Sequence, residues 1–392
     1  MNLDELLTRA VDRIYPTKED LEELLKKDKK LRVYQGFDPT GQNLHIGHMI
    51  GLRKLKQWQD LGHKVIFLIG DFTALVGDPS GKSESRKMLN KKDVLQNAKT
   101  YKEQAGKILN FSGDNPAEVR FNSEWLAKMS GLEFIKISSL LSLQQVIERD
   151  LFQERLKSGQ DLFMNEFFYP VMQAYDSVAM DIDVEIGGVD QTFNMLMGRK
   201  LIRHMLKKDK FVMTTPLLTD SSGQKIGKTE GNVIAMIDRP SELYRKIMAL
   251  GDDVIVKGLE YLTDVPINEI GEIEQKIKSG ENPIKFKKKL AFEVTKQLNS
   301  EDDAKKAEEE FERVVQKGEP PQDILEIDIK GDDIIDENLL VKHSLADSKS
   351  DAKRLFEQNA VRIDGQKIST GQKVENGILN VGRKLVKLNL KN

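Results

Sequence analysis

The first part of the chain alternates short apolar runs with a helical pattern. Residues 31–37 (LRVYQGF) and 64–72 (KVIFLIGDF) are rich in β-branched and aromatic side chains, which favours strands. Between them, residues 46–61 place apolar side chains at helical spacing. A strand, a helix and a strand in this order predict the βαβ unit of a parallel sheet. Further strand-like runs, separated by helical stretches, lie at residues 183–186, 211–213 and 232–236.

These patterns divide the chain into three predicted domains and a linker. Residues 1–235 predict an α/β domain built on a Rossmann-like, doubly wound parallel sheet. Residues 236–318 are helical and heavily charged, as in KFKKKLAFEVTKQL, and predict a small helical domain. Residues 319–337 combine Pro320-Pro321 with an acidic run and predict a linker. Residues 338–392 predict a small α+β domain.

The C-terminal segment has clear local signals and an uneven charge. The stretch SKSDAKRLFEQNAVRIDGQKI predicts a capped helix, with Asn359 as its C-cap, and then a hairpin that turns at Asp364-Gly365. Residues 338–392 hold 11 Lys/Arg and 5 Asp/Glu, a net charge of +6, whereas residues 319–337 carry −7. A basic domain behind an acidic spacer predicts a nucleic-acid-binding module. An ordinary solvated surface beside a linker is the alternative.

Composition narrows the class of protein. The 392 residues are 39% hydrophobic, enough for a core in each domain. No apolar run approaches the roughly 18 residues of a membrane span. The absence of cysteine excludes disulfides, cysteine-based zinc sites and a thiol nucleophile. Because residues 1–15 carry acids and lack the apolar core of a signal peptide, we expect a cytoplasmic protein with no membrane segment.

A histidine pair follows the first predicted strand. In GFDPTGQNLHIGHMIGLRKL a strand ends at Gly36-Phe37, a Pro/Gly turn follows, and a helix begins near His45. His45 and His48 share one face of the first helical turn. The unpaired N–H groups and the dipole at this end of a helix favour an anion, so two imidazoles added there predict phosphate binding. A zinc site would need further ligands nearby, and no H-E-x-x-H motif is present.

Two loops with lysines resemble phosphate-binding segments. Residues 225–229 read KIGKT, with two lysines three apart. Residues 77–83 read GDPSGKS, which resembles a P-loop but has Val76 where that motif requires glycine. Ordinary loop charges are common in a chain with 61 basic residues. The KIGKT lysines therefore gain meaning only together with the histidine pair.

The segment EFFYPVMQAYDSVAM carries three polar side chains on one helical arc. At about 100° per residue, Tyr169, Gln173 and Asp176 fall within roughly 60° of one another. Burying a phenol, an amide and a carboxylate on an apolar face is costly unless they meet a polar ligand. The alternative is that they only cap a buried helix. Further along, GGVDQTFN combines glycines that let a ligand approach the backbone with Asp190, which can accept from ribose hydroxyls.

Together these motifs resemble the class I aminoacyl-tRNA synthetases. HIGH follows a first strand, and KIGKT, after later strands, matches the K-M-S-K-S loop of that class at two of five positions. Its departures point toward the tyrosyl forms of the loop, as does the Y-P-x-x-Q helix with its later aspartate. The motifs span residues 34–229. The chain as a whole resembles the bacterial-type tyrosyl-tRNA synthetases, which end in an S4-like RNA-binding domain.

The resemblance implies a reaction and the residues that carry it. L-Tyrosine would react with ATP, accompanied by Mg²⁺, to give tyrosyl-adenylate and pyrophosphate, and tRNA(Tyr) would then accept the tyrosine at its 3′ end. A homodimer is also implied. The implied catalytic residues are Thr40, His45, His48, Lys82, Arg86, Lys225 and Lys228. The implied tyrosine-binding residues are Tyr34, Asp78, Tyr169, Gln173, Asp176 and Gln191. The implied ATP-binding residues are Gly36, Asp38, His45, Gly47, His48, Gly188, Asp190, Lys225 and Lys228. The candidate RNA-binding residues are Lys342, Lys349, Lys353, Arg354 and Arg362. We name no protein ligand for a metal.

Three other functions fit part of the sequence. A tryptophanyl-type synthetase shares the HIGH fold and a similar Y-P-x-x-Q helix, but Asp176 suits a phenol hydroxyl. A nucleotidyltransferase with an H-x-G-H helix would leave the basic C-terminal domain unexplained. A non-catalytic RNA-binding paralogue conflicts with the presence of both halves of the ATP site.

Overall fold

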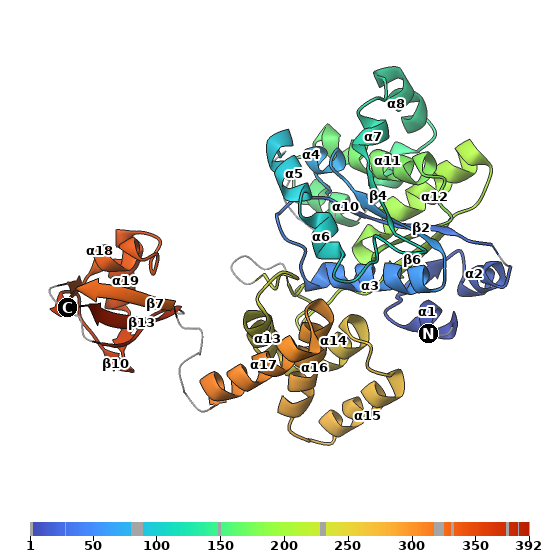
Figure 1. Cartoon of the computed structure of the whole chain (residues 1–392). Coiled ribbons are helices and arrows are strands. Elements are labelled where there is room, and N and C mark those ends of the chain that lie inside the picture. The colour runs from blue at the N-terminus through green and yellow to red at the C-terminus, as the bar shows by residue number, and fades with distance from the viewer. Residues whose placement is uncertain are drawn as a thin grey trace. The chain divides into compact units, whose positions relative to one another are not determined.

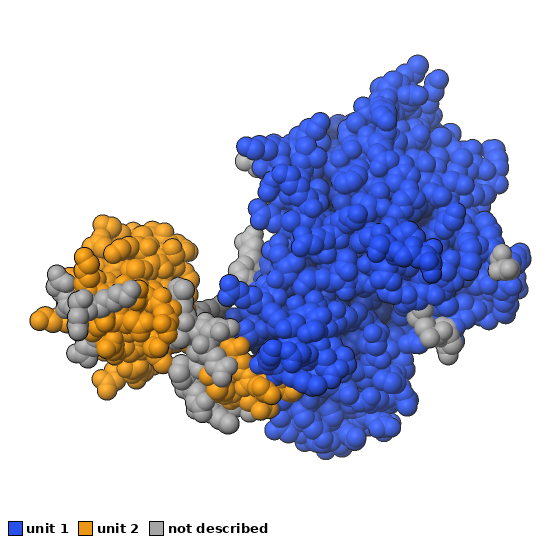
Figure 2. Space-filling view, viewed as in Figure 1, with its two compact units in different colours: residues 1–307 blue, residues 308–392 orange. Residues whose placement is uncertain are grey.

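The computed structural model describes residues 3–27, 29–79, 89–147, 150–227, 233–316, 325–330, 333–373, 376–382 and 384–391. The chain divides into two compact units, residues 1–307 and 308–392, which Figure 2 shows in different colours. None of the helices within the described ranges is both long and apolar enough to cross a bilayer.

A mostly parallel sheet forms the centre of the first unit (Figure 1). In the described residues its strand order is β1-β6-β5-β2-β3-β4, and only the β1–β6 pair is antiparallel. The strands are β1 Arg13–Tyr15, β2 Arg32–Phe37, β3 Lys64–Ile69, β4 Glu118–Phe121, β5 Val184–Gly188 and β6 Phe211–Thr215. The predicted parallel α/β sheet is confirmed. The two edge strands, β1 and β4, are additions that the sequence analysis did not identify.

The chain order reverses in the middle of this sheet. β2 leads through α3 (Ile46–Asp60) to β3 on one side, whereas β5 leads through α12 (Thr192–Leu206) to β6 on the other. Figure 1 shows α3 on one face of the sheet, and α11 (Met164–Ala179) and α12 on the opposite face. In doubly wound sheets, ligands bind beyond the carboxyl ends of the strands at this reversal. The site is therefore expected beyond the ends of β2 and β5.

The strand predicted at residues 232–236 is wrong in the part that the structure describes. Instead, Ile46 N donates to Ile234 O at 3.0 Å, and Met236 N donates to Leu44 O at 2.9 Å. Ile234 and Met236 are buried. The apolar run therefore packs against the start of α3 through a short backbone bridge, and does not extend the sheet.

Helices surround the sheet and continue after it in the same unit. Those before α11 are α1 Leu3–Thr8, α2 Lys18–Leu25, α4 Thr73–Val76, α5 Lys91–Ala98, α6 Tyr101–Ala105, α7 Ser123–Leu126, α8 Gly131–Ser138, α9 Leu143–Ile147 and α10 Asp150–Lys157. The later elements are η1 Val189–Gln191, α13 Pro240–Met248, η2 Asp252–Val254, α14 Ile255–Leu262, α15 Ile267–Lys278, α16 Ile284–Leu298 and α17 Glu301–Phe311. Arg53 of α3 donates to Asp264 at 2.6 Å, and Arg9 donates to Thr263 O at 2.6 Å. These contacts bind α3 and the N-terminus to the end of α14.

The second unit is a small α+β domain with its own core. Its sheets have the orders β10-β9-β12-β13-β7 and β11-β8 in the described residues. The elements are η3 Glu312–Gln316, β7 Leu325–Lys330, β8 Ile334–Ile335, α18 Glu337–Lys342, α19 Lys349–Glu357, β9 Val361–Ile363, β10 Gln366–Lys367, β11 Gln372–Lys373, β12 Gly377–Val381 and β13 Lys384–Lys391. Its core includes Leu340, Ala352, Val361 and Leu379, all buried.

Local signals in this unit match the structure, and one segment differs from its prediction. Ser348 caps α19, Asn359 adopts φ 54° after that helix, and Asp364-Gly365 turn the β9–β10 hairpin with φ of 46° and 83°. Part of the segment predicted as a linker is strand β7, which pairs in parallel with β13. In LEIDIK the isoleucines are buried and the acids exposed, which is the alternation of a strand. The linker prediction relied on the acidic composition and did not use this alternation.

Candidate functional site

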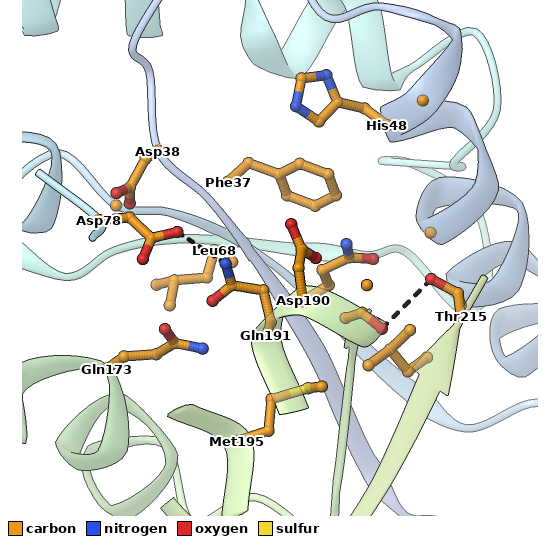
Figure 3. A pocket seen from close by; sticks show the side chains of 18 of the residues that line it. Phe37, Asp38, His48, Leu68, Asp78, Gln173, Asp190, Gln191, Met195 and Thr215 are labelled. Atoms are coloured by element: carbon orange, nitrogen blue, oxygen red, sulfur yellow. Dashed lines mark hydrogen bonds between the residues drawn. The ribbon is translucent and has the colours of Figure 1, made fainter. Parts of the chain in front are cut away.

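A pocket at the carboxyl ends of β2 and β5 gathers the predicted site residues of the first unit (Figure 3). Its lining includes Tyr34, Gly36, Asp38, Thr40, His45, Gly47, His48, Asp78, Tyr169, Gln173, Asp176, Gly188, Asp190, Gln191 and Lys225. The predicted Lys82, Arg86 and Lys228 lie outside the described residues. Segments up to about 190 positions apart thus meet where the fold places a ligand.

The two histidines occupy the first turn of α3. His45 is the N-cap residue, and its Nδ1 accepts from Gly47 N at 3.1 Å. The Nδ1 atom of His48 accepts from His45 N at 3.2 Å, and the two rings stack with centroids 3.8 Å apart. A Cβ atom on Gly47 would lie 3.0 Å from the His45 ring, so any larger residue at this position would crowd the ring. The backbone therefore fixes both imidazoles at the positive end of the helix.

Three residues of α11 point into the pocket, as their helical spacing predicts. The Tyr169 hydroxyl donates to Asp38 Oδ2 at 2.9 Å, and burial together with nearby carboxylates raises the pKa of Tyr169 well above its ordinary value. Gln173 lies one turn further along the same face. Asp176 follows and is 3% exposed. The arc of phenol, amide and carboxylate is therefore a wall of the pocket.

Asp176 has two partners that sequence reasoning missed. Trp125 Nε1 donates to one carboxylate oxygen at 2.8 Å, and Asn122 Nδ2 donates to the other at 3.3 Å. Burial raises the pKa of Asp176 well above its ordinary value, and these two donors oppose the rise. Asn122 directly follows β4, a strand-end position that could have marked it if β4 had been identified.

A second polar group forms the floor of the pocket beside Tyr34. The Tyr34 hydroxyl lies 3.1 Å from Ser177 Oγ, and Ser177 Oγ donates to Glu185 Oε2 at 3.1 Å. Glu185 also forms an ion pair with Lys210, and both side chains are almost completely buried. Sequence reasoning missed this group. A charged residue inside the apolar strand VEIGG was the available signal.

Beside Gln173, Asp78 and Gln191 hold each other in place. Gln191 Nε2 donates to Asp78 Oδ2 at 2.7 Å, the contact drawn as a dashed line in Figure 3. The side-chain oxygen Oε1 of Gln191 accepts from Asn194 Nδ2 at 2.9 Å. A carboxylate and an amide from distant loops therefore share one side of the pocket with Gln173 (Figure 3).

The lysine loop lies against the histidine helix. Lys225 Nζ lies 2.7 Å from Asp190 Oδ2, and Ile226 N donates to Leu218 O at 2.8 Å. Gly227 has φ 95°, and a Cβ atom there would lie 3.1 Å from Ile46 Cγ1. The described residues of the KIGKT loop therefore lie beside the first turn of α3.

The predicted RNA-binding residues all lie in the second unit and are exposed. Lys342 ends α18, three residues lie on α19, and one lies on β9. The α19 residues are Lys349, Lys353 and Arg354, and the β9 residue is Arg362. Arg354 is partly engaged by an ion pair with Asp351 at 2.6 Å.

Such a sheet, with a histidine pair and a lysine loop at its reversal point, is typical of class I aminoacyl-tRNA synthetases. The family model of class I tRNA synthetases (W and Y) matches residues 26–316. The chain belongs to this family.

Individual relatives refine this assignment. The tyrosine–tRNA ligase of Thermotoga maritima is 45% identical over 366 residues, covering 93% of this chain and 90% of that protein. That of Dehalococcoides mccartyi strain 195 is 42% identical over 370 residues, covering 94% and 92%. The predicted resemblance to bacterial tyrosyl-tRNA synthetases is confirmed.

Solved structures agree with the fold. A C-terminally truncated mitochondrial tyrosyl-tRNA synthetase from Coccidioides posadasii superimposes with a TM-score of 0.62 at 25% identity, covering 76% of this chain and 88% of that one. The tyrosyl-tRNA synthetase of Archaeoglobus fulgidus, solved with L-tyrosine, gives a TM-score of 0.60 at 22% identity and covers 78% of this chain and 98% of that one. The latter supports the fold alone.

Proposed function

We propose that this chain activates L-tyrosine with ATP and transfers it to tRNA(Tyr). The observation that carries the proposal is the composition of the pocket. One wall presents a buried carboxylate and a phenol suited to a substrate hydroxyl, and the other end presents histidines and a lysine suited to phosphates. No other amino-acid side chain combines a flat aromatic body with a hydroxyl at its tip.

Asp176 and Tyr34 are the proposed readers of the tyrosine hydroxyl. Asp176 is buried and already accepts two hydrogen bonds, so its free lone pairs can accept from a phenol. An occupant without the hydroxyl would leave these buried groups without that partner. Such sites reject the smaller analogue strongly, a rule for which tyrosine-specific synthetases are themselves the usual example. The same geometry disfavours tryptophan.

Polar residues at the other end of the amino acid would bind its ammonium group. We assign Asp78, Tyr169 and Gln173 to this contact, with Gln191 beside them. Asp78 supplies negative charge, and Gln191 holds it by the 2.7 Å hydrogen bond. This leaves the tyrosine carboxylate directed toward the histidine pair, where ATP would bind.

The phosphate end would act by positioning and by electrostatics. The tyrosine carboxylate would attack the α-phosphorus of ATP in line, which requires no covalent enzyme intermediate. Donors fixed before the reaction stabilise the charge that grows on the leaving pyrophosphate. We assign this role to Thr40, His45, His48, Lys82, Arg86, Lys225 and Lys228. Gly36, Asp38, Gly47 and Gly188 would line the nucleotide, and Asp190 would accept from the ribose.

ATP would enter as its Mg²⁺ complex. Among the described residues, no three side chains of the His, Asp or Glu type gather in a way that could hold a metal ion. In this proposal the ion belongs to the substrate and is carried by the phosphates. It would supply charge neutralisation on the phosphates, while the protein's own donors set their direction.

The second unit is the proposed tRNA-binding module, an S4-like domain. Its lysines and arginines on α18, α19 and β9 are exposed, and its core is separate from that of the first unit. Basic side chains that face solvent can bind an RNA backbone with little desolvation cost. The tRNA 3′ end would then attack the carbonyl of the adenylate in the first unit.

We also propose that the protein acts as a cytoplasmic homodimer. Large apolar side chains are exposed on α8, α9, α10 and the start of α11. They include Leu132 (62%), Ile135 (64%), Leu143 (59%), Leu156 (50%) and Met164 (65%). Apolar groups that gather on neighbouring elements mark an interaction surface. Because α11 also carries Gln173 and Asp176, such an interface would support the amino-acid site from behind.

Pyrophosphate exchange into ATP tests the proposal directly. Each of the twenty amino acids is supplied separately with Mg²⁺ and labelled pyrophosphate. We expect exchange with tyrosine alone among them at low concentration. Exchange with tryptophan would favour the tryptophanyl alternative, and exchange with none would refute amino-acid activation.

A further inference from the structure

Glu185 occupies an unusual place in the pocket. It comes from β5, lines the pocket and is 2% exposed. None of the contacts assigned above to tyrosine or ATP uses it. Its Oε1 atom accepts from Gln173 Nε2 at 3.2 Å, and its Oε2 atom accepts from Ser177 and Lys210. One buried carboxylate thus contacts a proposed ammonium-binding residue on one side and the Tyr34 network on the other.

The contact with Gln173 determines which way its amide points. A carboxylate paired with a lysine only accepts hydrogen bonds, so the amide nitrogen of Gln173 must face Glu185. The amide oxygen then points away from Glu185. In the described structure this oxygen is buried and has no hydrogen-bond partner. Because Gln173 lines the pocket, this unpaired acceptor lies beside the ligand space, and a donor on the ligand would satisfy it after a small movement of the amide.

The reversed amide would have the opposite effect. Its oxygen would face the Glu185 oxygen at about the same 3.2 Å, so two acceptors would oppose each other. Its nitrogen would face the ligand, where a substrate ammonium also brings only donors. Glu185 therefore discriminates between an amide orientation that binds an ammonium group and one that repels it.

The fold keeps the Glu185 carboxylate buried and paired. Lys210 is fully buried and donates to both Glu185 and Ser177, so the carboxylate is paired inside the protein. Gly198 of α12 leaves the space for this group, because a Cβ atom there would lie 2.5 Å from Lys210 Nζ. Ser177 comes from α11, Glu185 from β5, and Lys210 directly precedes β6, so three separate parts of the fold hold the pair.

We propose that Glu185 is a positioning residue for amino-acid recognition: it fixes the Gln173 amide so that its oxygen meets the ammonium group of the substrate. The proposal rests on the proposed function, because it takes the ligand to be an α-amino acid. Glu185 acts through Gln173 and need not touch the substrate. We therefore expect loss of the Glu185 carboxylate to weaken binding of the ammonium group and to have little effect on binding of the rest of the ligand.

The test compares two ligands in full-length protein. L-Tyrosine and 3-(4-hydroxyphenyl)propanoate differ only by the ammonium group, and calorimetric titration gives the Kd of each. In E185Q the residue can both donate and accept, so the Gln173 amide is no longer held in one orientation. We expect tyrosine to bind about tenfold more weakly, because one hydrogen bond to a charged group is lost. The Kd of the propanoate should change by no more than about twofold.

A swapped double variant and a matched control sharpen the result. Q173E/E185Q places the acceptor-only side chain next to the ammonium and an amide behind it, so the preference for tyrosine should return. D183N makes the parallel change from acid to amide just before β5, outside the pocket, and should leave both Kd values unchanged. Equal losses for both ligands in E185Q, or no loss, would overturn the proposal. Failure of the wild-type protein to prefer tyrosine over the propanoate would instead count against the proposed function.

Discussion

Lys225 Nζ lies 2.7 Å from Asp190 Oδ2, so a lysine proposed for the phosphates is paired with the acid proposed for the ribose. The side chains are 43% and 27% exposed, and ion pairs in such surroundings contribute at most about 1 kcal/mol. The pair is therefore easily exchanged for contacts with a nucleotide. It holds the loop near the pocket without blocking it.

Removing this lysine should affect catalysis far more than stability. In Lys225→Ala the single-turnover rate of adenylate formation should fall about 10²–10³-fold, the usual cost of one preorganised donor. The free energy of unfolding should change by less than about 1 kcal/mol. Lys305→Ala, on the exposed face of α17, is the control. A normal rate of adenylate formation in the Lys225 variant would show that Lys225 does not act in this step.

Asp176 should determine the choice between tyrosine and phenylalanine. Asp176→Asn replaces a charged acceptor by a neutral amide at a buried position. We expect kcat/KM for tyrosine-dependent exchange to fall by the equivalent of about 1.5–3 kcal/mol, with a smaller loss for phenylalanine. Asp181→Asn, at the exposed turn after α11, is the matched control. An unchanged ratio of the two kcat/KM values would show that the hydroxyl is read elsewhere.

Lys54 should make stability depend on pH. It is 1% exposed on α3 and donates to Leu6 O and Arg9 O at 2.9 and 2.7 Å. Burial, with Arg9 and Arg53 nearby, lowers its pKa from 10.5 to about 7. Between these values the unfolded chain holds a proton that the folded chain has lost. The free energy of unfolding should therefore rise with pH in this window, by up to about 1.4 kcal/mol per unit from this group.

Comparison of two variants isolates this contribution. Urea unfolding, followed by tryptophan fluorescence at pH 7, 8 and 9, should give a shallower rise for Lys54→Met than for the wild type. Lys56→Met, on the same helix but paired with Asp60 at the surface, should keep the wild-type slope. Equal slopes in all three proteins would mean that Lys54 titrates as an ordinary lysine.

The exposed apolar surface of α8 gives a test of assembly. Leu132→Lys combined with Ile135→Lys should convert the proposed dimer to a monomer, because each buried charge would lack a partner. Light scattering after gel filtration measures the mass. Ile267→Lys, an exposed isoleucine on α15, should leave it unchanged. A wild-type monomer, or a dimer that survives the double change, would rule out this surface as the interface.

Removing the second unit should separate activation from transfer. A stop after Gln316 respects the pairing of β7 with β13, whereas a stop after Glu337 would leave β7 without its partner strand. Pyrophosphate exchange should remain near the wild-type rate, and aminoacylation of tRNA should fall sharply. The tRNA affinity of the full chain should also decrease more steeply with salt than that of the truncated protein. Normal aminoacylation with an unchanged salt slope would show that the unit does not bind RNA.

The parts of the site that follow helical or motif spacing could be predicted from the sequence. Tyr169, Gln173 and Asp176 share a face because α11 has a fixed period, and the positions of His45 and His48 follow from where α3 begins. These relations are local. They depend on the helix itself and not on the elements packed around it.

Partners that depend on tertiary structure could not be predicted in this way. Trp125 reaches Asp176 only because β4 ends beside β3, and β4 is too short and polar to stand out as a strand. Lys210 resembles any surface lysine until the fold buries it against Glu185. The apolar run at 232–236 has the composition of a strand, and only its packing against α3 shows that it is not one.

The backbone bridge between Leu44–Ile46 and Ile234–Met236 also explains how the lysine loop tolerates change. Hydrogen bonds from Ile46 N and Met236 N fix the chain after the loop, and Ile226 N bonded to Leu218 O fixes the chain within it. Peptide groups make all of these contacts, and every residue except proline provides the same N–H. A substitution at Ile226 therefore leaves this anchoring intact, whereas Gly227, with φ 95° and little space beside Ile46, requires glycine. The side chain at position 226 can therefore differ from the methionine of K-M-S-K-S while the loop remains in register with the histidine helix.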